Sequence, residues 1–215
     1  MIHFRLFGIP VRVHPFFWIT LAVLGGALHA DSADDILKVA LFLLAGFVSI
    51  LVHEMGHALT AKKFGAAPMI ELQAFGGYAA FSGVRMTRTK SFLISAAGPF
   101  FQIVLGLGVY FVFTSMRLES FKLNPEAVYF LNVLALISLF WALFNLLPVL
   151  PLDGGQILNS LLGPQRVRLS LWISLTVALA SGLAMFVYFG NIFGPIFMGI
   201  FAWQSWQTMQ QIRSR

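Results

Sequence analysis

The chain of 215 residues contains no cysteine and few charged residues. Without cysteine it can form no disulfide, and any metal site must use nitrogen and oxygen ligands. Only 10% of the residues are charged, whereas 59% are hydrophobic and the mean hydropathy is +0.85. This composition excludes an ordinary soluble globular domain and indicates an integral membrane protein. No linker, charge block or low-complexity tract divides the chain, so we predict one membrane domain over residues 1–215.

Six hydrophobic runs are long enough to cross or nearly cross a bilayer. They cover residues 16–29, 36–60, 92–116, 127–152, 169–189 and 192–208. The first run is short, and the arginines ahead of it and "ALHADSA" behind it would also suit a secretory signal peptide. We predict an all-α polytopic membrane protein with about six transmembrane helices.

The basic residues are distributed unevenly between these runs. The connections on one side hold eleven: Arg5, Arg12, Lys62, Lys63, Arg85, Arg88, Lys90, Arg166, Arg168, Arg213 and Arg215. The other side holds three, Lys38, Arg117 and Lys122, with the acids Asp31, Asp34, Asp35, Glu119 and Glu126. Lys and Arg are enriched in the cytoplasmic loops of membrane proteins, so the side with eleven basic residues is assigned to the cytoplasm. We therefore predict a multi-pass protein of the cell membrane with both termini cytoplasmic. This topology explains the net charge of +6, and we expect no nucleic-acid partner.

The second run continues into "SILVHEMGHALTAKKFG", which places three ionisable side chains in an apolar segment. His53 and His57 are four residues apart, so on a helix both imidazoles share one face and can bind one ion. Glu54 lies about 100° around the helix from His53 and can act as a base. A lone membrane histidine is usually a packing residue, but a carboxylate in hydrocarbon costs about 2.5 kcal/mol or more unless compensated. A divalent cation compensates it, so the pattern predicts a zinc site.

A catalytic zinc usually takes three protein ligands and keeps one position for water. Five of the other acids map to outer connections and Glu71 maps to an inner loop, which leaves Asp153 in "FNLLPVLPLDGGQIL". The second and fourth runs both run inward, so His53 and Asp153 approach the same membrane depth. We predict Asp153 as the third ligand of one zinc ion per chain, although "LDGG" alone would also suit an ordinary turn.

HExxH on a membrane helix, followed about 90 residues later by "NLLPVLPLDGG", resembles the site-2 protease family of intramembrane zinc metalloproteases. The resemblance extends over most of the chain and corresponds to a minimal form without PDZ or CBS domains. One departure is Gln102, where family members commonly have Asn after "AGPxx". The residues that match the family's HExxH and NxxPxxPxD patterns are His53, Glu54, His57, Asn145, Pro148, Pro151 and Asp153.

This resemblance implies an intramembrane zinc endopeptidase that cuts within or near the transmembrane segment of a membrane protein, as in regulated intramembrane proteolysis. It implies that Glu54 is the general base and that Asn145 holds the substrate or the developing oxyanion; an interhelical hydrogen bond is the alternative for Asn145. The expected partners are a membrane-spanning protein substrate and the lipid bilayer, while a homo-oligomer or a regulatory membrane partner stays open. The competing functions are a metal transporter and a non-catalytic relative that binds membrane helices.

Two segments outside the helices have the alternation of β-strands. Residues 69–82 carry Gly76 and Gly77 and predict a β-hairpin or re-entrant sheet at the cytoplasmic face. The N-terminal "FRLFGIPVRV" alternates around a Gly-Ile-Pro turn and predicts interfacial strands within residues 1–15 that join the hairpin. In the resembled family a similar segment pairs with the substrate by strand addition; a purely structural hairpin is the alternative.

Overall fold

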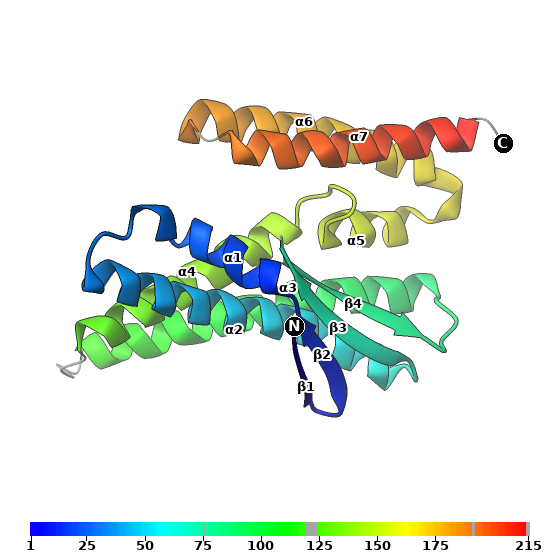
Figure 1. Cartoon of the computed structure of the whole chain (residues 1–215). Coiled ribbons are helices and arrows are strands. Elements are labelled where there is room, and N and C mark those ends of the chain that lie inside the picture. The colour runs from blue at the N-terminus through cyan, green and yellow to red at the C-terminus, as the bar shows by residue number, and fades with distance from the viewer. Residues whose placement is uncertain (75, 119–123, 191, 214–215) are drawn as a thin grey trace. The chain divides into compact units, whose positions relative to one another are not determined.

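The computed structural model describes residues 1–74, 76–118, 124–190 and 192–213, which form helices and one small sheet (Figure 1). The chain divides into two compact units, one of Met1–Arg85 with Ala97–Ala142 and the other of Met86–Ala96 with Leu143–Arg215. Glu119, Lys122 and Arg215 of the charge distribution and Phe75 of the predicted hairpin lie outside the described residues.

The sheet has four strands in the order β1 (Ile2–Leu6), β2 (Ile9–Val13), β3 (Ala67–Gln73) and β4 (Gly76–Ser82). The outer pairs are antiparallel, and β2 and β3 are parallel. The N-terminal strands therefore join the predicted hairpin. The first turn lies at Phe7 and Gly8 rather than at Gly-Ile-Pro, because these residues have φ angles of 51° and 74°. Positive φ at both positions is typical of a two-residue hairpin turn.

The two faces of the sheet differ in polarity. One face is apolar and packs against the long helix α2 (Ala33–Lys63); its strand residues Ile9, Val11, Val13, Ile70 and Leu72 are at most 1% exposed. The other face carries a polar row that crosses all four strands, because successive partners in register are His3, Arg12, Glu71 and Tyr78. The alternation of strand side chains produces both faces.

Helix α2 begins at a capping box. Ser32 Oγ accepts a hydrogen bond from the backbone N–H of Asp35 at 3.1 Å, and Asp35 Oδ2 accepts one from the Ser32 N–H at 3.1 Å. Lys62 and Lys63 lie in the last turn, where positive charges interact favourably with the negative end of the helix dipole. Its 31 residues span about 46 Å, which exceeds the apolar thickness of a bilayer.

Four helical segments are long and apolar enough to cross a membrane: Ala33–Lys63, Arg88–Ser115, Pro125–Asn145 and Pro164–Tyr188. They contain α2, most of α3 (Arg88–Leu118), α4 (Pro125–Asn145) and most of α6 (Val167–Phe189). Figure 1 shows α2 grouped with α3 and α4, which belong to the first unit from Ala97 onward and as far as Ala142, respectively. The structure thus supports a multi-spanning helical protein and identifies four of the six expected spans.

The other two expected spans do not correspond to helices that are both long and apolar enough to cross a membrane. The first, 16–29, overlaps the ten-residue helix α1 (Pro15–Leu24), about 15 Å long, and includes a short 3-10 turn at Ala27–His29. The last, 192–208, corresponds to α7 (Phe193–Arg213), whose final ten residues include Gln204, Gln207, Gln210 and Gln211. These glutamines lower the mean hydropathy of α7.

The expected fourth span, 127–152, is interrupted at Asn145. Helix α4 ends there, and a non-helical segment leads to α5 (Asp153–Leu162). Pro148 and Pro151 explain the break, because proline lacks a backbone N–H and disfavours the helical conformation of the preceding residue. In the second unit Val149 and Leu152 of this segment pack with Ala178 of α6 and Met198 of α7.

Candidate metal centre

A buried stripe along α2 carries both predicted histidine ligands. His53 is 2% exposed and His57 is 7% exposed, and Ser49, one turn earlier, is fully buried. The Nε2 atoms of the two imidazoles are 3.1 Å apart. Two nitrogens held about 2.0–2.1 Å from one tetrahedral zinc are separated by roughly 3.3 Å. The imidazole pair therefore fits a zinc ion without rearrangement of the helix.

The histidine His53 also contacts the side chain of Gln102 on α3. His53 Nδ1 is 2.8 Å from Gln102 Oε1, and Gln102 Nε2 donates to Ser49 Oγ at 2.9 Å. Ser138 of α4 donates to the same Ser49 oxygen at 3.0 Å. All four side chains are buried, so His53 belongs to a polar network that connects three helices of the first unit.

The other imidazole, His57, lies against the backbone of α3. A Cβ atom built at Gly98 would overlap the Nε2 and Cε1 atoms of His57. At Gly56 a Cβ would come 2.7 Å from the Ala97 carbonyl oxygen. Glycine at these two positions lets α2 and α3 approach closely, as small residues do between membrane helices.

The predicted base Glu54 is 4% exposed and lies next to the start of β4. A Cβ atom at Gly77 would come 2.6 Å from Glu54 Cγ and 2.8 Å from Leu72 Cδ2. The absence of a side chain at Gly77 therefore leaves room for the glutamate. The structure brings together His53, His57 and Glu54 with the edge strand of the sheet, all within the first unit.

The two remaining predicted site residues, Asn145 and Asp153, belong to the second unit. Asn145 is the last residue of α4, and Asp153 is the first residue of α5. The segment between them is held by Ser174 of α6, whose hydroxyl accepts a hydrogen bond from the Leu150 N–H at 2.7 Å. Ser174 Oγ is in turn 2.9 Å from Ser205 Oγ of α7.

The two glycines after Asp153 pack against the same segment. A Cβ at Gly154 would overlap the carbonyl oxygens of Leu146 and Leu147, and a Cβ at Gly155 would come 2.6 Å from the Leu150 nitrogen. The Leu150–Pro151 peptide bond is cis. The "LDGG" sequence thus begins a helix whose first turn touches the chain that precedes it.

Together, His53, His57 and Asp153 offer two imidazole nitrogens and one carboxylate, a ligand set that could hold a metal ion. Two histidines and one acid with an open fourth position are typical of catalytic zinc sites. Without thiolates, this donor set does not favour the softer metals.

On the polar face of the sheet, Glu71 is the centre of a hydrogen-bonded row. Tyr78 donates to Glu71 Oε2 at 2.7 Å, and Arg12 donates to Glu71 Oε1 at 3.2 Å. The Tyr78 hydroxyl is the main cause that holds the pKa of Glu71 below its ordinary value of 4.5, with Gln73 and Arg12 adding to it against the effect of burial. The same hydrogen bond raises the pKa of Tyr78. Sequence reasoning did not identify this row.

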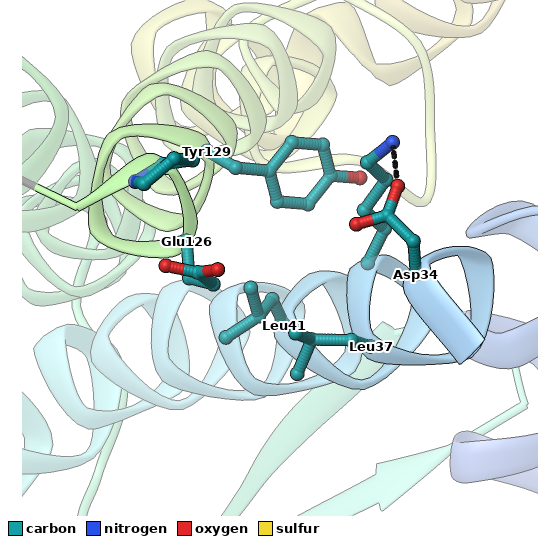
Figure 2. Close-up of a pocket in the computed structure, with 7 residues that line it drawn as sticks. Asp34, Leu37, Leu41, Glu126 and Tyr129 are labelled. Carbon is teal, nitrogen blue, oxygen red and sulfur yellow. Dashed lines mark ion pairs between the residues drawn. The ribbon is translucent and has the colours of Figure 1, made fainter.

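A small surface pocket between the beginnings of α2 and α4 contains none of the predicted site residues. Figure 2 shows its lining, in which Asp34 forms an ion pair with Lys38 at 2.5 Å next to the hydroxyl end of Tyr129, while Glu126 lies on the other side of the pocket. Along α2, Asp34 precedes His53 by 19 residues, or about 28 Å of helix. Its acidic side chains are thus remote from the imidazole pair.

Comparison with known proteins agrees with this arrangement. The family model described as Peptidase family M50 matches residues 41–124 and 119–189, so the chain belongs to peptidase family M50. The chain is 32% identical over 160 residues to the zinc metalloprotease MJ0392 of Methanocaldococcus jannaschii, covering 74% of this chain and 44% of that protein. It is 36% identical over 166 residues to the putative zinc metalloprotease sll0528 of Synechocystis, covering 73% of this chain and 42% of that protein.

The chain thus spans less than half the length of these two relatives. Its structure is similar to the solved structure titled Site-2 Protease from Methanocaldococcus jannaschii, with a TM-score of 0.67 and 27% sequence identity. That similarity covers 96% of this chain and 94% of the other. The chain therefore has the fold of that protein, while four of the six expected spans are identified among the described residues.

Proposed function

We propose that this chain is an intramembrane zinc endopeptidase that hydrolyses a peptide bond within or near the transmembrane segment of a membrane protein. The observation that carries the proposal is the convergence of two buried imidazoles, with Nε2 atoms 3.1 Å apart, beside a buried glutamate in an apolar helix. Membership of a peptidase family and the names of the zinc metalloprotease relatives support it.

The zinc ion would be held by His53, His57 and Asp153, one ion per chain. The donor chemistry and the imidazole geometry support this set, and Asp153 begins a helix held by Ser174. When bound, zinc supplies a water of lowered pKa and polarises the scissile carbonyl group.

Glu54 would take a proton from the attacking water and pass it to the leaving amine, acting first as general base and then as general acid. Its burial and its position next to His53 support this role. Asn145 would hydrogen-bond the substrate or the oxygen on which negative charge develops. Its position eight residues before Asp153, at the end of α4, supports that placement.

A helical substrate must be unwound locally before its carbonyl can be attacked, and its exposed backbone groups then need partners. We infer that β4 supplies these partners by strand addition. Strand β4 is an outer strand of the sheet, and its second residue, Gly77, lies next to Glu54. A substrate strand on β4 would therefore run close to the catalytic carboxylate.

The proposed topology has six spans, with both termini cytoplasmic and the sheet at the cytoplasmic side of the cell membrane. The asymmetry of basic residues supports this orientation. For the two spans beyond the four apolar helices, α1 and the 3-10 turn after it would cross as one short segment, and α7 would cross with its glutamines at the inner end.

The decisive experiment compares Glu54→Gln, His53→Ala and the unaltered protein in liposomes. Glu54→Gln should retain zinc and lower cleavage of membrane-spanning peptides by about 10²-fold or more, whereas His53→Ala should lose both. If Glu54→Gln cleaves normally, the proposal is wrong. Zinc transport by both the unaltered protein and Glu54→Gln would instead indicate a transporter.

A further inference from the structure

The amide of Gln102 occupies a position from which it can select one tautomer of a zinc ligand. Gln102 is fully buried on α3 and contacts two residues of α2, Ser49 and His53, that are four apart. We propose that Gln102 is a positioning residue that holds the His53 proton on Nδ1 and thereby leaves Nε2 as the metal-binding atom. This inference rests on the proposed zinc site and explains the departure from Asn at this position.

The orientation of the amide follows from its neighbours. The nitrogen end of the Gln102 side chain lies 2.9 Å from Ser49 Oγ and 3.4 Å from the Ser49 carbonyl oxygen. A serine hydroxyl can donate or accept, but a carbonyl oxygen can only accept. If the amide were flipped, two carbonyl oxygens would face each other in a buried site. The Nε2 group must therefore face Ser49, and Oε1 must face His53.

The tautomer of His53 follows from the amide. Gln102 Oε1 has no proton to give, so the 2.8 Å contact requires His53 Nδ1 to donate. In the neutral imidazole the other nitrogen, Nε2, then carries the lone pair. This is the atom that lies 3.1 Å from His57 Nε2. A hydrogen-bonded Nδ1–H also fixes the ring orientation and raises the basicity of the ligand nitrogen.

The rest of the network keeps Gln102 in place. Ser138 of α4 donates to Ser49 Oγ at 3.0 Å, so this hydroxyl accepts hydrogen bonds from both Ser138 and Gln102. Ser49 and Ser138 are fully buried, where water does not compete for these bonds. The methylene by which glutamine exceeds asparagine lets the amide bridge from α3 to both Ser49 and His53. We therefore assign the extra length of Gln102 to this bridge.

The test measures zinc affinity by competition with a chelator, on the full chain in detergent. Gln102→Leu removes the acceptor with little change in volume and should weaken zinc binding by about 10- to 100-fold. Gln102→Glu keeps an acceptor for the His53 N–H but loses the donor to Ser49, so it should recover part of the affinity that Gln102→Leu loses. Gln207→Leu, the same chemical change at an exposed position of α7, is the matched control and should have no effect.

Two outcomes would overturn the proposal. One is a Gln102→Leu protein that binds zinc as tightly as the control while His53→Ala does not bind it. The other is loss of affinity in Gln102→Leu that Gln102→Glu fails to restore even in part although both variants keep the helical circular dichroism of the unaltered protein, which indicates a packing role only.

A second measurement separates this inference from the proposed function. Nitrogen-15 spectra of histidine-labelled, metal-free protein report which ring nitrogen of His53 is protonated, and they need neither zinc nor cleavage. The proposal requires Nδ1–H in the unaltered protein and a redistributed proton in Gln102→Leu. Protonation at Nε2 in the unaltered protein would contradict it, even if the protein proves to be a zinc peptidase. If the protein takes up no zinc, the proposed function fails while the tautomer remains measured.

Discussion

Individual glycines determine how closely the metal-binding helix can be approached. The His57 imidazole lies so close to Gly98 that no side chain fits at that position. The Glu54 side chain lies nearly as close to Gly77. These two glycines lie against different members of the HExxH motif, one a proposed metal ligand and the other the proposed base. Their substitution should therefore separate metal binding from catalysis.

Substituting Gly98→Ala should displace the His57 imidazole, because the new methyl group would overlap it. We expect zinc affinity to fall by about tenfold or more, and cleavage to fall with it. The measurement is zinc content after dialysis against a chelator. The control is Gly108→Ala on the same helix, where no heavy atom lies within 4 Å of the new Cβ; equal zinc content in the two variants would contradict the prediction.

At Gly77→Ala the new methyl group would press most closely on Glu54 Cγ and on Leu72 Cδ2. We expect this variant to keep its zinc and to lose about 10²-fold in cleavage rate, since small displacements of a catalytic group have effects of that size. Measured zinc content and rate decide the matter. A variant that loses zinc would show that the strand supports the metal site itself.

Among single elements, the segment between α4 and α5 depends on a hydroxyl of another helix. Ser174→Ala would leave the Leu150 N–H without its acceptor, which typically costs about 1–3 kcal/mol for a buried group. We expect a lower unfolding temperature and weaker zinc binding, because Asp153 follows this segment. The matched control is Thr176→Ala, whose hydroxyl bonds only to carbonyls of its own helix; it should leave both properties unchanged.

The sheet should respond to pH through Glu71. Its folded-state pKa lies below its ordinary value of 4.5, so its ionised form contributes stability above that pH. This contribution is lost as the pH falls through the lowered folded-state pKa. Thermal unfolding of the unaltered protein and of Glu71→Gln between pH 7 and pH 3 should therefore converge at the acid end. A constant difference over the whole range would show that Glu71 does not titrate in this way.

The sequence predicted the elements whose signals are local. The spacing of His53 and His57 on α2 and the alternation around Gly76 depend only on neighbouring residues, and both the imidazole pair and the strands are present. The expected span ran to Leu152, seven residues past the end of α4, because the apolar run continues beyond Asn145. Pro148 and Pro151 indicate a break in this helix, but hydropathy alone does not show where it falls.

Contacts between elements were less accessible from the sequence. Ser49 extends the four-residue spacing of His53 and His57, so its position on the buried stripe could have been inferred. Its link to Gln102 could not, because nothing in the sequence gives the rotation of α3 against α2. The clearances at Gly98 and Gly77 also required coordinates.

For the molecule as a whole, the absence of native cysteine makes its orientation directly testable. Single cysteines can replace Phe7, which is 68% exposed in the N-terminal turn, and Leu28, which is 73% exposed before α2. With cytoplasmic termini, a membrane-impermeant maleimide should label Leu28→Cys in intact cells and Phe7→Cys only after permeabilisation. The reverse pattern would invert the proposed topology.

The length of α2 after His53 fixes the distance between the imidazole pair and the basic end of the helix. Ten residues separate His53 from Lys63, which corresponds to about 15 Å of helix between the imidazole and the basic end. If Lys62 and Lys63 sit at the lipid headgroups and the chain is the proposed peptidase, we expect the scissile bond to lie at a fixed distance from the water boundary. Moving the polar flank of a target by a few residues should then shift the cut by the same number.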